Sequence, residues 1–408
     1  MLVLGGGFAG LAAVGELARL ARRRRADLHV RLVDRRSHSV FSPLLPDLIT
    51  ERVGEGAVAH PLAEHCRRLR VAFSRAEVRA IDPVSRRVET DQGPLEADCL
   101  IVCLGCETNY FGDEGLAACA PGLKTVEQGA AIRKRALALM ASPEGEPPAL
   151  LVVGGGYTGF EVASQLAVLA SRALGRPYRE LPGACPVVIV ERSDEVLRNC
   201  SPDIRAWSLE MLQDFGVQVR TGVSVESCEA DGRARLSDGT EFDRALVVWC
   251  AGVTPGAAAA RLGVARVAGG RLAVDEHLRL AGADNAFAAG DVAGPMQPGA
   301  DRPLRMSVQF SLAGGRGAAR NAVRALLGEP LRPFAPRDPG YLVPLAPGKA
   351  AGEVLGVSLH GRLPNLLHYV MCGLRSWSWR TRRALLADLW RARKRRGIRV
   401  PSMKGPDR

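Results

Sequence analysis

Long hydrophobic runs are missing from this sequence. No stretch of 18 or more uncharged apolar residues occurs in its 408 positions, so we expect no transmembrane helix. The N-terminus enters a strand directly, which is not the organisation of a secretory signal peptide. This strand has only four residues before Gly5, so the sequence leaves open whether a few residues precede this start.

Convincing cysteine pairs are also missing. The ten cysteines are scattered among apolar and loop residues, a pattern typical of a reducing compartment, where cysteine acts as a small buried apolar residue. Cys103 and Cys106 form a C-x-x-C, but no second pair and no nearby histidine completes a zinc site. We predict no metal site and keep a redox role for this pair as the weaker interpretation.

Apolar and charged residues are present in globular proportions. The chain is 47% hydrophobic and 24% charged, which excludes a disordered protein and allows two or three domain cores. The net charge is +12, and much of it is concentrated near the C-terminus. The composition therefore predicts folded domains with a basic tail.

Glycine is abundant and follows a pattern at two places. The segments "GGGFAG" (residues 5–10) and "GGGYTG" (residues 154–159) each follow an apolar strand as G-x-G-x-x-G. The first glycine makes a tight turn, the second lets the backbone approach a pyrophosphate, and the third lets the helix pack on the strand. The phosphates would then lie at the positive N-terminus of the following helix.

Each glycine pattern is followed by a helix and then by a strand that ends on an acid. These acids are Asp34 in "LHVRLVD" and Glu191 in "CPVVIVE". A carboxylate at this place accepts a hydrogen bond from a ribose 2′-hydroxyl, so two complete βαβ units predict two bound dinucleotides. Glu191 would also repel a 2′-phosphate and therefore favours NADH over NADPH, although Arg192 beside it weakens that preference.

The order of segments predicts an α/β fold with two Rossmann-like dinucleotide-binding domains. We place the first domain at residues 1–113 and 273–330, the second at 114–272, and a C-terminal region at 331–408. The segment "PGLKTVEQGAAIRKRALALM" predicts an amphipathic linker helix. The segment "DNAFAAGDVA" returns the chain to the first domain, where Asp291 follows a short strand and precedes a helix that starts near Met306. A carboxylate there is well placed to bind a ribityl or phosphate group.

These motifs, together with "LGCETNYFG", "WCAGVTP" and "AFAAGDVA", resemble those of the two-dinucleotide-binding flavoprotein oxidoreductases. The segments "VDRRSHSVFSPLLPDLIT" and "LKTVEQGAAIRKRAL" narrow the resemblance to the type II NADH dehydrogenases, which are single-subunit NADH:quinone oxidoreductases. The resemblance covers almost the whole chain and implies FAD in the first domain and NADH in the second. Disulfide reductases of this group carry a C-x-x-x-x-C after the FAD fingerprint, but residues 11–60 contain no cysteine, which excludes a dithiol relay.

The resemblance also implies the site residues. Glu161 would lie near the nicotinamide and the flavin, although a first-turn acid is also favoured by the helix dipole alone. The family pattern A-Q-x-A-x-Q-x-G appears as "VQFSLAGG", so Gln309 is kept as a predicted catalytic residue, or merely starts a helix. Ala313 replaces the second glutamine and removes one polar contact for a quinone carbonyl. The predicted cofactor contacts are Gly5, Gly7, Phe8, Ala9, Gly10, Asp34, Arg35, Val78, Gly105, Asp291, Val308, Gly154, Gly156, Tyr157, Thr158, Gly159, Glu191 and Gly252.

The tail lacks acidic residues almost completely. Between Arg362 and Arg399, basic residues alternate with tryptophans, and only Asp388 is acidic. Leucine and tryptophan recur at helical spacing as an apolar stripe made of Leu385, Leu386, Leu389 and Trp390. This composition predicts a helix that lies in the interface of an anionic membrane. A solvated basic face and a nucleic-acid arm are the other interpretations, and the stripe favours lipid.

We therefore predict a peripheral membrane flavoenzyme on the cytoplasmic face of the cell membrane. In it NADH reduces FAD, and the flavin passes two electrons to a membrane quinone without ion pumping. We expect no nucleic-acid partner, and the sequence leaves a homodimer open. The competing hypotheses are another reductase of the same group, either sulfide:quinone-like or a diaphorase, and a redox sensor with little turnover. No convincing cysteine pair supports the sulfide enzyme, and Ala313 is the only support for the sensor.

Overall fold

The computed structural model describes residues 1–24, 27–142 and 146–395, and it divides into two compact units. Unit 1 consists of Met1–Ser39, His60–Glu107 and Val253–Asp338. Unit 2 consists of Val40–Ala59, Thr108–Gly252 and Pro339–Arg408.

These boundaries differ from the predicted ones mainly at three places. Residues 253–272 belong to unit 1, residues 40–59 belong to unit 2, and the predicted separate C-terminal region is part of unit 2 from Pro339 on. The second difference arises because Pro46–Leu48, a short 3₁₀ helix in the apolar segment "FSPLLPDLI", packs against helices of unit 2. The apolar part of the segment that carries the narrower family resemblance therefore folds with unit 2.

Unit 1 is built on a five-stranded parallel sheet with the order β21-β9-β1-β2-β5. Its central strands are continuous apolar runs because both faces of the sheet are covered. The strands are β1 (Leu2–Leu4), β2 (Arg31–Asp34), β5 (Ala72–Arg75), β9 (Leu100–Val102) and β21 (Ala286–Ala288).

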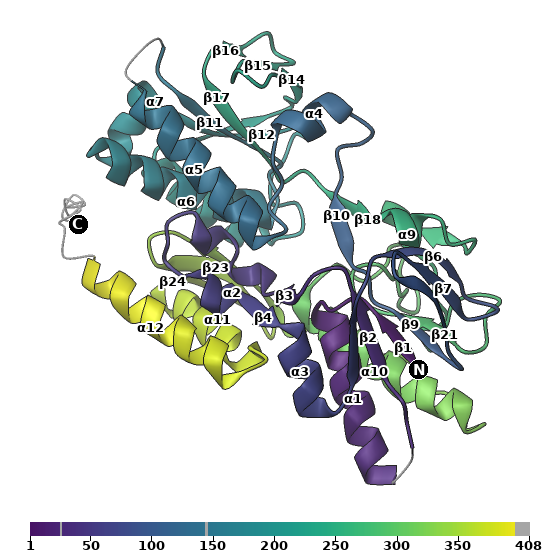
Figure 1. The fold of residues 1–408 in the computed structure, drawn as a ribbon. Coiled ribbons are helices and arrows are strands. Elements are labelled where there is room, and N and C mark those ends of the chain that lie inside the picture. Colours follow the sequence, from purple (N-terminus) through teal and green to yellow (C-terminus); the bar gives the residue numbers. More distant parts are fainter. Residues whose placement is uncertain (25–26, 143–145, 396–408) are drawn as a thin grey trace. The chain divides into compact units, whose positions relative to one another are not determined.

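Two helices of unit 1, α1 (Phe8–Arg24) and α10 (Val308–Leu326), lie side by side along this sheet (Figure 1). The two helices approach each other so closely that a Cβ at Gly315 would collide with the backbone of Ala9, and this position therefore requires glycine. An antiparallel sheet, β6-β7-β8, forms the edge of the unit. The remaining elements are α3 (Leu62–Leu69), β6 (Val78–Asp82), β7 (Arg87–Thr90), β8 (Gly93–Glu96), α9 (Ala257–Ala260), β19 (Arg266–Val267) and β20 (Arg271–Leu272).

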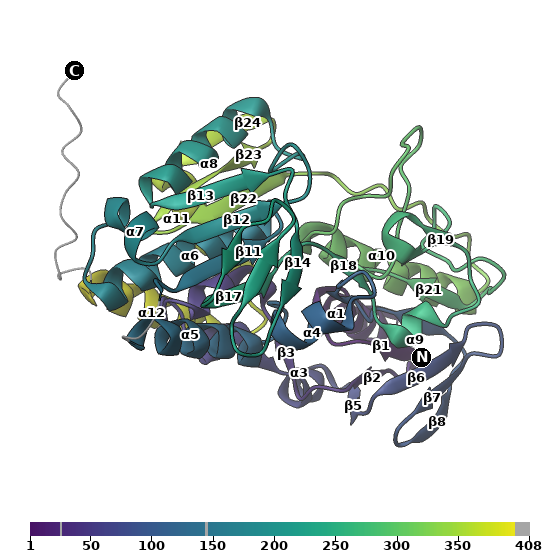
Figure 2. The same cartoon turned by 90° about the horizontal axis from the view of Figure 1, so that it is seen from above.

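Unit 2 repeats the same plan with a four-stranded parallel sheet of order β13-β12-β11-β17 (Figure 2). Its strands are β11 (Ala149–Val153), β12 (Val187–Glu191), β13 (Val217–Thr221) and β17 (Ala245–Trp249). Its other elements are α2 (Glu55–Val58), α4 (Glu114–Cys119), α5 (Val126–Ala141), α6 (Tyr157–Leu174), α7 (Leu181–Ala184), α8 (Pro202–Asp214), β14 (Val225–Cys228), β15 (Ala234–Leu236) and β16 (Glu241–Phe242). Short strands near the sequence boundaries of the units are β3 (His38–Val40), β4 (Ala59–Pro61), β10 (Cys106–Thr108) and β18 (Val253–Pro255).

The linker helix begins as its sequence indicates. Thr125 caps α5 by accepting a hydrogen bond from the Gln128 amide, and the Gln128 side chain accepts one from the Thr125 amide in return. This reciprocal capping satisfies two N–H groups that a helix start leaves unpaired.

One disulfide departs from the expectation that the cysteines are thiols. Cys119 and Cys228 are bonded and join the end of α4 to the end of β14. They are 109 positions apart in the sequence, and only the fold brings their Cα atoms within 6.0 Å. No disulfide joins Cys103 to Cys106 in this structure.

The C-terminal part of unit 2 contains an antiparallel sheet followed by two helices. The sheet is made of β22 (Gly340–Leu345), β23 (Lys349–Val354) and β24 (Val357–Gly361). The helices are α11 (Arg362–Arg375) and α12 (Trp379–Arg395). Within the described residues, no helix is both long enough and apolar enough to cross a membrane.

The predicted apolar stripe on the last helix is only partly correct. Leu386 and Trp390 are exposed, whereas Leu385 is only 1% exposed and belongs to the core. Two neighbouring leucines point in different directions because successive positions of a helix are about 100° apart. The end of the predicted tail, residues 396–399, lies outside the described residues.

Candidate functional site

The first glycine fingerprint connects β1 to α1 in unit 1. Gly5 has φ +103°, and a Cβ there would collide with the backbone of Cys103 at the end of β9. A Cβ at Gly10 would collide with the Gly5 carbonyl oxygen, whereas nothing lies within 4 Å of a Cβ at Gly7. The turn therefore needs its outer glycines for its own geometry and leaves open space at the middle one, as a pyrophosphate site requires.

Asp34 holds this loop from the end of β2. Its carboxylate is 7% exposed and accepts hydrogen bonds from the Gly6 amide at 2.6 Å and the Arg36 amide at 2.8 Å. Arg35 points away into ion pairs with Glu107 at 2.7 Å and Glu77 at 3.5 Å. The acid is therefore fixed where the adenosine ribose of a dinucleotide would lie.

Other predicted contacts surround the fingerprint to different degrees. Phe8 begins α1 and is half-buried. Ala9 is buried and lies so close to Gly290 that a Cβ at Gly290 would collide with its side chain. Gly105 has φ +68° with open space around it. Val78 begins β6 and packs against the apolar core of unit 1.

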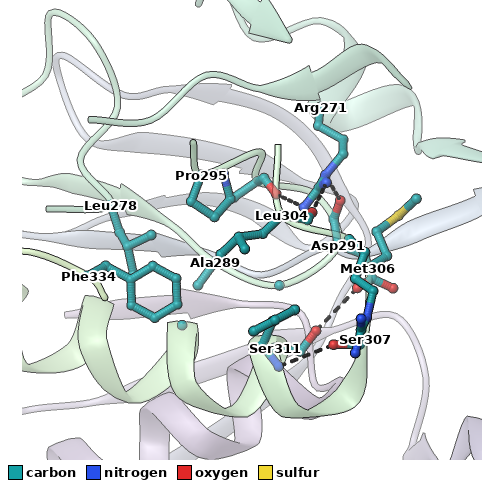
Figure 3. A pocket seen from close by; sticks show the side chains of 15 residues that line it. Arg271, Leu278, Ala289, Asp291, Pro295, Leu304, Met306, Ser307, Ser311 and Phe334 are labelled. Atoms are coloured by element: carbon teal, nitrogen blue, oxygen red, sulfur yellow. Dashed lines mark hydrogen bonds between the residues drawn. The ribbon is translucent and has the colours of Figure 1, made fainter. Parts of the chain in front are cut away.

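Asp291 follows β21, as predicted, and lies beside the start of α10 (Figure 3). Its Oδ1 accepts a hydrogen bond from the Ser311 hydroxyl at 3.2 Å, and its carbonyl accepts one from Arg271 Nε at 3.1 Å. Cys106 Sγ donates to the same carbonyl at 3.3 Å. Residues from three elements, β10, β20 and α10, thus hold Asp291 in place.

The start of α10 carries the predicted quinone-side residue. Val308 is the first helical residue, and Ser307 caps the helix by accepting a hydrogen bond from the Phe310 amide. Gln309 and Ala313 are both half-buried and lie one turn apart, on the same face of the helix. Alanine at position 313, where the family pattern has glutamine, therefore removes a polar group from the helix face that carries Gln309.

The second fingerprint connects β11 to α6 in unit 2 with the same geometry. Gly154 has φ +107°, and a Cβ there would lie 2.7 Å from the Ala251 Cα. A Cβ at Gly159 would collide with the Gly154 carbonyl oxygen, while Gly156 again has open space. Gly252, at φ +146°, continues the loop after β17 that lies against this turn.

Glu191 holds the second loop in the way Asp34 holds the first. Its carboxylate accepts hydrogen bonds from the Gly155 amide at 2.7 Å and the Ser193 amide at 2.8 Å. Although burial acts to raise the pKa of Glu191, these two hydrogen bonds lower it overall. The group is therefore ionised, which suits recognition of a ribose hydroxyl and repulsion of a phosphate.

Tyr157 and Thr158 are the first two residues of α6. The Tyr157 hydroxyl donates to the Asn199 carbonyl at 3.3 Å, and its ring stacks on Tyr341 with centroids 5.3 Å apart. These contacts fix the Tyr157 side chain against the C-terminal sheet of unit 2.

Glu161 is the fifth residue of α6, just past the first turn in which the sequence analysis had placed it, and it interacts with a second acid that the sequence analysis missed. This acid is Asp47, which is 2% exposed. Burial raises the pKa of Glu161 well above its ordinary range, and the charge of Asp47 raises it further. Burial likewise raises the pKa of Asp47, against the charge of Arg52 and the hydrogen bonds that the carboxylate accepts.

A polar network holds Asp47 inside unit 2. Its Oδ1 accepts a hydrogen bond from Gln165 Nε2 at 2.7 Å, and its Oδ2 accepts one from the Tyr369 hydroxyl at 2.9 Å. Thr50 donates to Gln165 Oε1 at 2.7 Å. Among the described residues, no salt bridge reaches Asp47 or Glu161. The only sequence signal for this network is an acid inside the apolar segment "FSPLLPDLI".

Comparison with known proteins identifies the family. A family described as pyridine nucleotide-disulphide oxidoreductase matches residues 1–323, which include both fingerprints and Asp291. The chain belongs to this family. The segment after its first fingerprint, residues 11–60, contains no cysteine.

Within this family, two similar relatives carry the name type II NADH:quinone oxidoreductase. The one from Staphylococcus aureus is 27% identical over 370 residues, which cover 89% of this chain and 91% of the relative. The one from Mycobacterium tuberculosis is 31% identical over 320 residues, which cover 72% of this chain and 66% of the relative. These matches confirm the resemblance to the type II NADH dehydrogenases.

Solved structures establish the fold. NDH2 from Plasmodium falciparum in complex with NADH superposes with a TM-score of 0.82 at 16% identity, covering 96% of this chain and 97% of that one. The sulfide:quinone oxidoreductase of Aquifex aeolicus reaches 0.76 at 18% identity, with 94% and 91% covered. The predicted α/β dinucleotide-binding fold is therefore confirmed.

Proposed function

We propose that this pyridine nucleotide-disulphide oxidoreductase is an FAD-dependent NADH:quinone oxidoreductase of type II. The observation that carries the proposal is the duplicated dinucleotide site, in which each fingerprint loop has an open middle glycine and a carboxylate fixed at the end of the next strand. The names of the curated relatives support NADH as donor and quinone as acceptor. The overall reaction is NADH + H⁺ + quinone → NAD⁺ + quinol.

FAD supplies the redox chemistry when bound, because it accepts a hydride from the nicotinamide and returns electrons to an acceptor. Unit 1 would hold it, with Gly7 open toward the pyrophosphate, Asp34 on the ribose, and Asp291 on the ribityl or phosphate group. Unit 2 would hold NADH through Gly156 and Glu191. The protein therefore contributes binding and orientation.

The reaction also consumes one proton for each turnover, and unit 2 contains groups suited to supply it. Burial and the charge of Asp47 raise the pKa of Glu161 well above its ordinary range, so its carboxyl group holds a proton to higher pH than an exposed glutamic acid, as a general acid requires. Gln309 at the start of α10 offers an amide to a quinone carbonyl. We assign Glu161 and Gln309 these roles. Ala313, which stands where the family pattern has a second glutamine, would make the acceptor pocket of this chain less polar than the family pattern implies.

We further propose that α11 and α12 attach the enzyme to the cytoplasmic face of a membrane. Exposed apolar side chains occur on both helices together with many arginines, as in helices that bind an anionic interface. A chain truncated after Gly361 should keep both fingerprints and lose binding to anionic vesicles. Unchanged vesicle binding of a folded, flavin-loaded truncated chain would contradict the attachment.

Steady-state oxidation of NADH by the purified FAD-loaded protein tests the activity. We expect little oxidation without an acceptor and rapid oxidation with a soluble quinone. Slow turnover with every quinone, despite tight binding of FAD and NADH, would instead favour the redox sensor that Ala313 leaves open. Rapid turnover with dyes but not with quinones would favour a diaphorase.

A further inference from the structure

Unit 2 contains a cavity of about 610 Å³ that none of the roles above uses. A volume of this size is typical of a small-molecule site. Its wall is formed by the segment after Asp47, the second half of α6, the turn between β22 and β23, α11 and α12. The lining residues that matter here are Arg52, Arg172, Arg362, Asn365, Leu366 and Arg393.

The cavity is strongly cationic. Four arginines line it against a single acid, Glu51. That acid is already paired, because Glu51 Oε1 lies 3.1 Å from Arg133 Nε. Within the described residues, neither Arg362 nor Arg393 forms a salt bridge with a carboxylate. The wall therefore presents positive charge that an anionic ligand would neutralise.

Part of this wall is rigidly held. The Arg52 guanidinium lies 4.6 Å from the centroid of the Tyr369 ring, and the Tyr369 hydroxyl is fixed by its hydrogen bonds to Asp47. Asn365 is only 9% exposed, and its side-chain oxygen has no hydrogen-bond partner in the described part of the chain. A buried amide oxygen that lacks a donor carries a desolvation cost, which a ligand with a hydroxyl group in the cavity would relieve.

An apolar face begins at the edge of the cavity. Leu366 lines the cavity and is also 60% exposed. It continues a row of exposed side chains at helical spacing on α11, made of Leu363, Leu366, Val370 and Leu374. The helix α12 contacts α11 (Figure 1). It exposes three further apolar side chains at helical spacing, Trp379, Leu386 and Trp390.

The charge of the cavity and the apolar character of this face select one kind of ligand. A soluble anion would use the arginines but not the leucines, and a neutral quinone would not need four guanidinium groups. We propose that the cavity binds the phosphodiester headgroup of an acidic phospholipid whose acyl chains lie on the apolar face of α11 and α12. This inference rests on the membrane attachment proposed above. It differs from that attachment in that one defined site binds the lipid, in addition to the general attraction between a basic surface and an anionic membrane.

Matched charge variants of the full-length, FAD-loaded protein separate these two kinds of binding. The double variant Arg362→Gln/Arg393→Gln removes two charges from the cavity, while Arg380→Gln/Arg383→Gln removes two exposed charges elsewhere on α12. Both lose the same long-range attraction, but only the first loses direct charge-assisted hydrogen bonds to phosphate. We expect the cavity variant to bind vesicles of phosphatidylcholine and phosphatidylglycerol about tenfold more weakly than the control variant.

A second measurement uses no membrane. Short-chain phosphatidylglycerol below its micelle concentration should raise the Tm of the intact protein and of the control variant, because a ligand stabilises the state that it binds. It should not raise the Tm of the cavity variant. Short-chain phosphatidylcholine and the chainless glycerol phosphodiester should have much smaller effects.

The outcomes distinguish this site from the membrane attachment itself. Equal vesicle affinity of the two double variants, or an equal rise in Tm with phosphatidylcholine, overturns the lipid site and leaves the attachment standing. If the intact protein does not bind phosphatidylglycerol vesicles at all, the attachment fails and the lipid site fails with it.

Discussion

The two units both bury acidic side chains, but they treat the charge in opposite ways. In unit 1, the 6% exposed Glu16 has Arg19 Nη2 and Arg320 Nε each 2.6 Å from its Oε1. Hydrogen bonds from Arg19 and then Arg320 lower the pKa of Glu16 to about 2, against the effect of burial. In unit 2, Asp47 and Glu161 have no such partner, and burial raises the pKa of both.

This difference separates an acid with a structural role from acids with a chemical one. Glu16 is a permanent charge that ties α1 to α10 behind the FAD fingerprint. Asp47 and Glu161 hold their protons to higher pH than exposed acids do, and Glu161 lies two residues after the last glycine of the second fingerprint. We therefore expect substitutions in unit 1 to change stability and those at the unit 2 pair to change proton-dependent chemistry.

Replacement of Glu161 should have the largest effect. The variant Glu161→Gln keeps the shape of the side chain but cannot donate an acidic proton. Because general acid catalysis contributes about 100-fold or more, we expect kcat with a quinone to fall by about that factor. Flavin content, and turnover with a one-electron acceptor that takes up no proton, should change little. An unchanged kcat with quinone and an unchanged pH profile would remove Glu161 from the mechanism.

Replacement of Glu16 should affect stability and not chemistry. Glu16→Gln loses two charge-assisted contacts, so we expect the free energy of unfolding to fall by about 2 kcal/mol at pH 7. Because the folded pKa is lowered, the stabilisation from Glu16 is present above its unfolded pKa of about 4.5 and is lost as the pH falls toward about 2. Urea unfolding at pH 7 and pH 3 should show the difference between wild type and variant shrinking at low pH. A constant difference would mean that the ion pairs do not cause it.

Asp47 should show the opposite dependence on pH. Its folded pKa is raised, so its contribution to stability is present below the unfolded pKa and is lost as the pH rises through the folded value. Asp47→Asn removes this dependence, and we expect its Tm to improve relative to wild type as the pH rises, by a free energy on the order of 1 kcal/mol. The exposed Asp301→Asn serves as the control. Parallel Tm curves for wild type and Asp47→Asn would show that Asp47 does not titrate in the folded protein.

Replacement of Glu191, the counterpart in unit 2 of the loop acid Asp34, should have the smallest effect. Replacing Glu191 by glutamine removes the charge that would repel a 2′-phosphate, so the preference for NADH over NADPH should narrow about fivefold. The ratio of kcat/KM for the two nucleotides measures this change. If the ratio stays the same, the ribose lies elsewhere in unit 2.

The sequence predicts features that depend on neighbouring residues. Both fingerprint turns form as predicted because a tight turn and a close helix require glycine at Gly5 and Gly154, where φ is positive. The acids at the ends of β2 and β12 are only one strand away from these turns. Such short-range requirements can be read directly from the residue pattern.

Features that depend on distant pairings could not be predicted in this way. Asp47 meets Tyr369 across 322 positions, and Cys119 meets Cys228 across 109. Nothing local indicates either contact. The same reason explains why the predicted boundaries and the compact units differ at residues 40–59, and why Leu385 is buried while Leu386 is exposed.

The measurement that tests the central proposal most directly follows the colour of the bound flavin without oxygen. The FAD-loaded protein is mixed first with one equivalent of NADH and then with a soluble quinone in a stopped-flow instrument. We predict that NADH bleaches the flavin absorbance, that the quinone restores it, and that the second step is the one slowed by Glu161→Gln. A flavin that NADH does not bleach, or that quinone does not reoxidise, would contradict assignment of this chain as an NADH:quinone oxidoreductase.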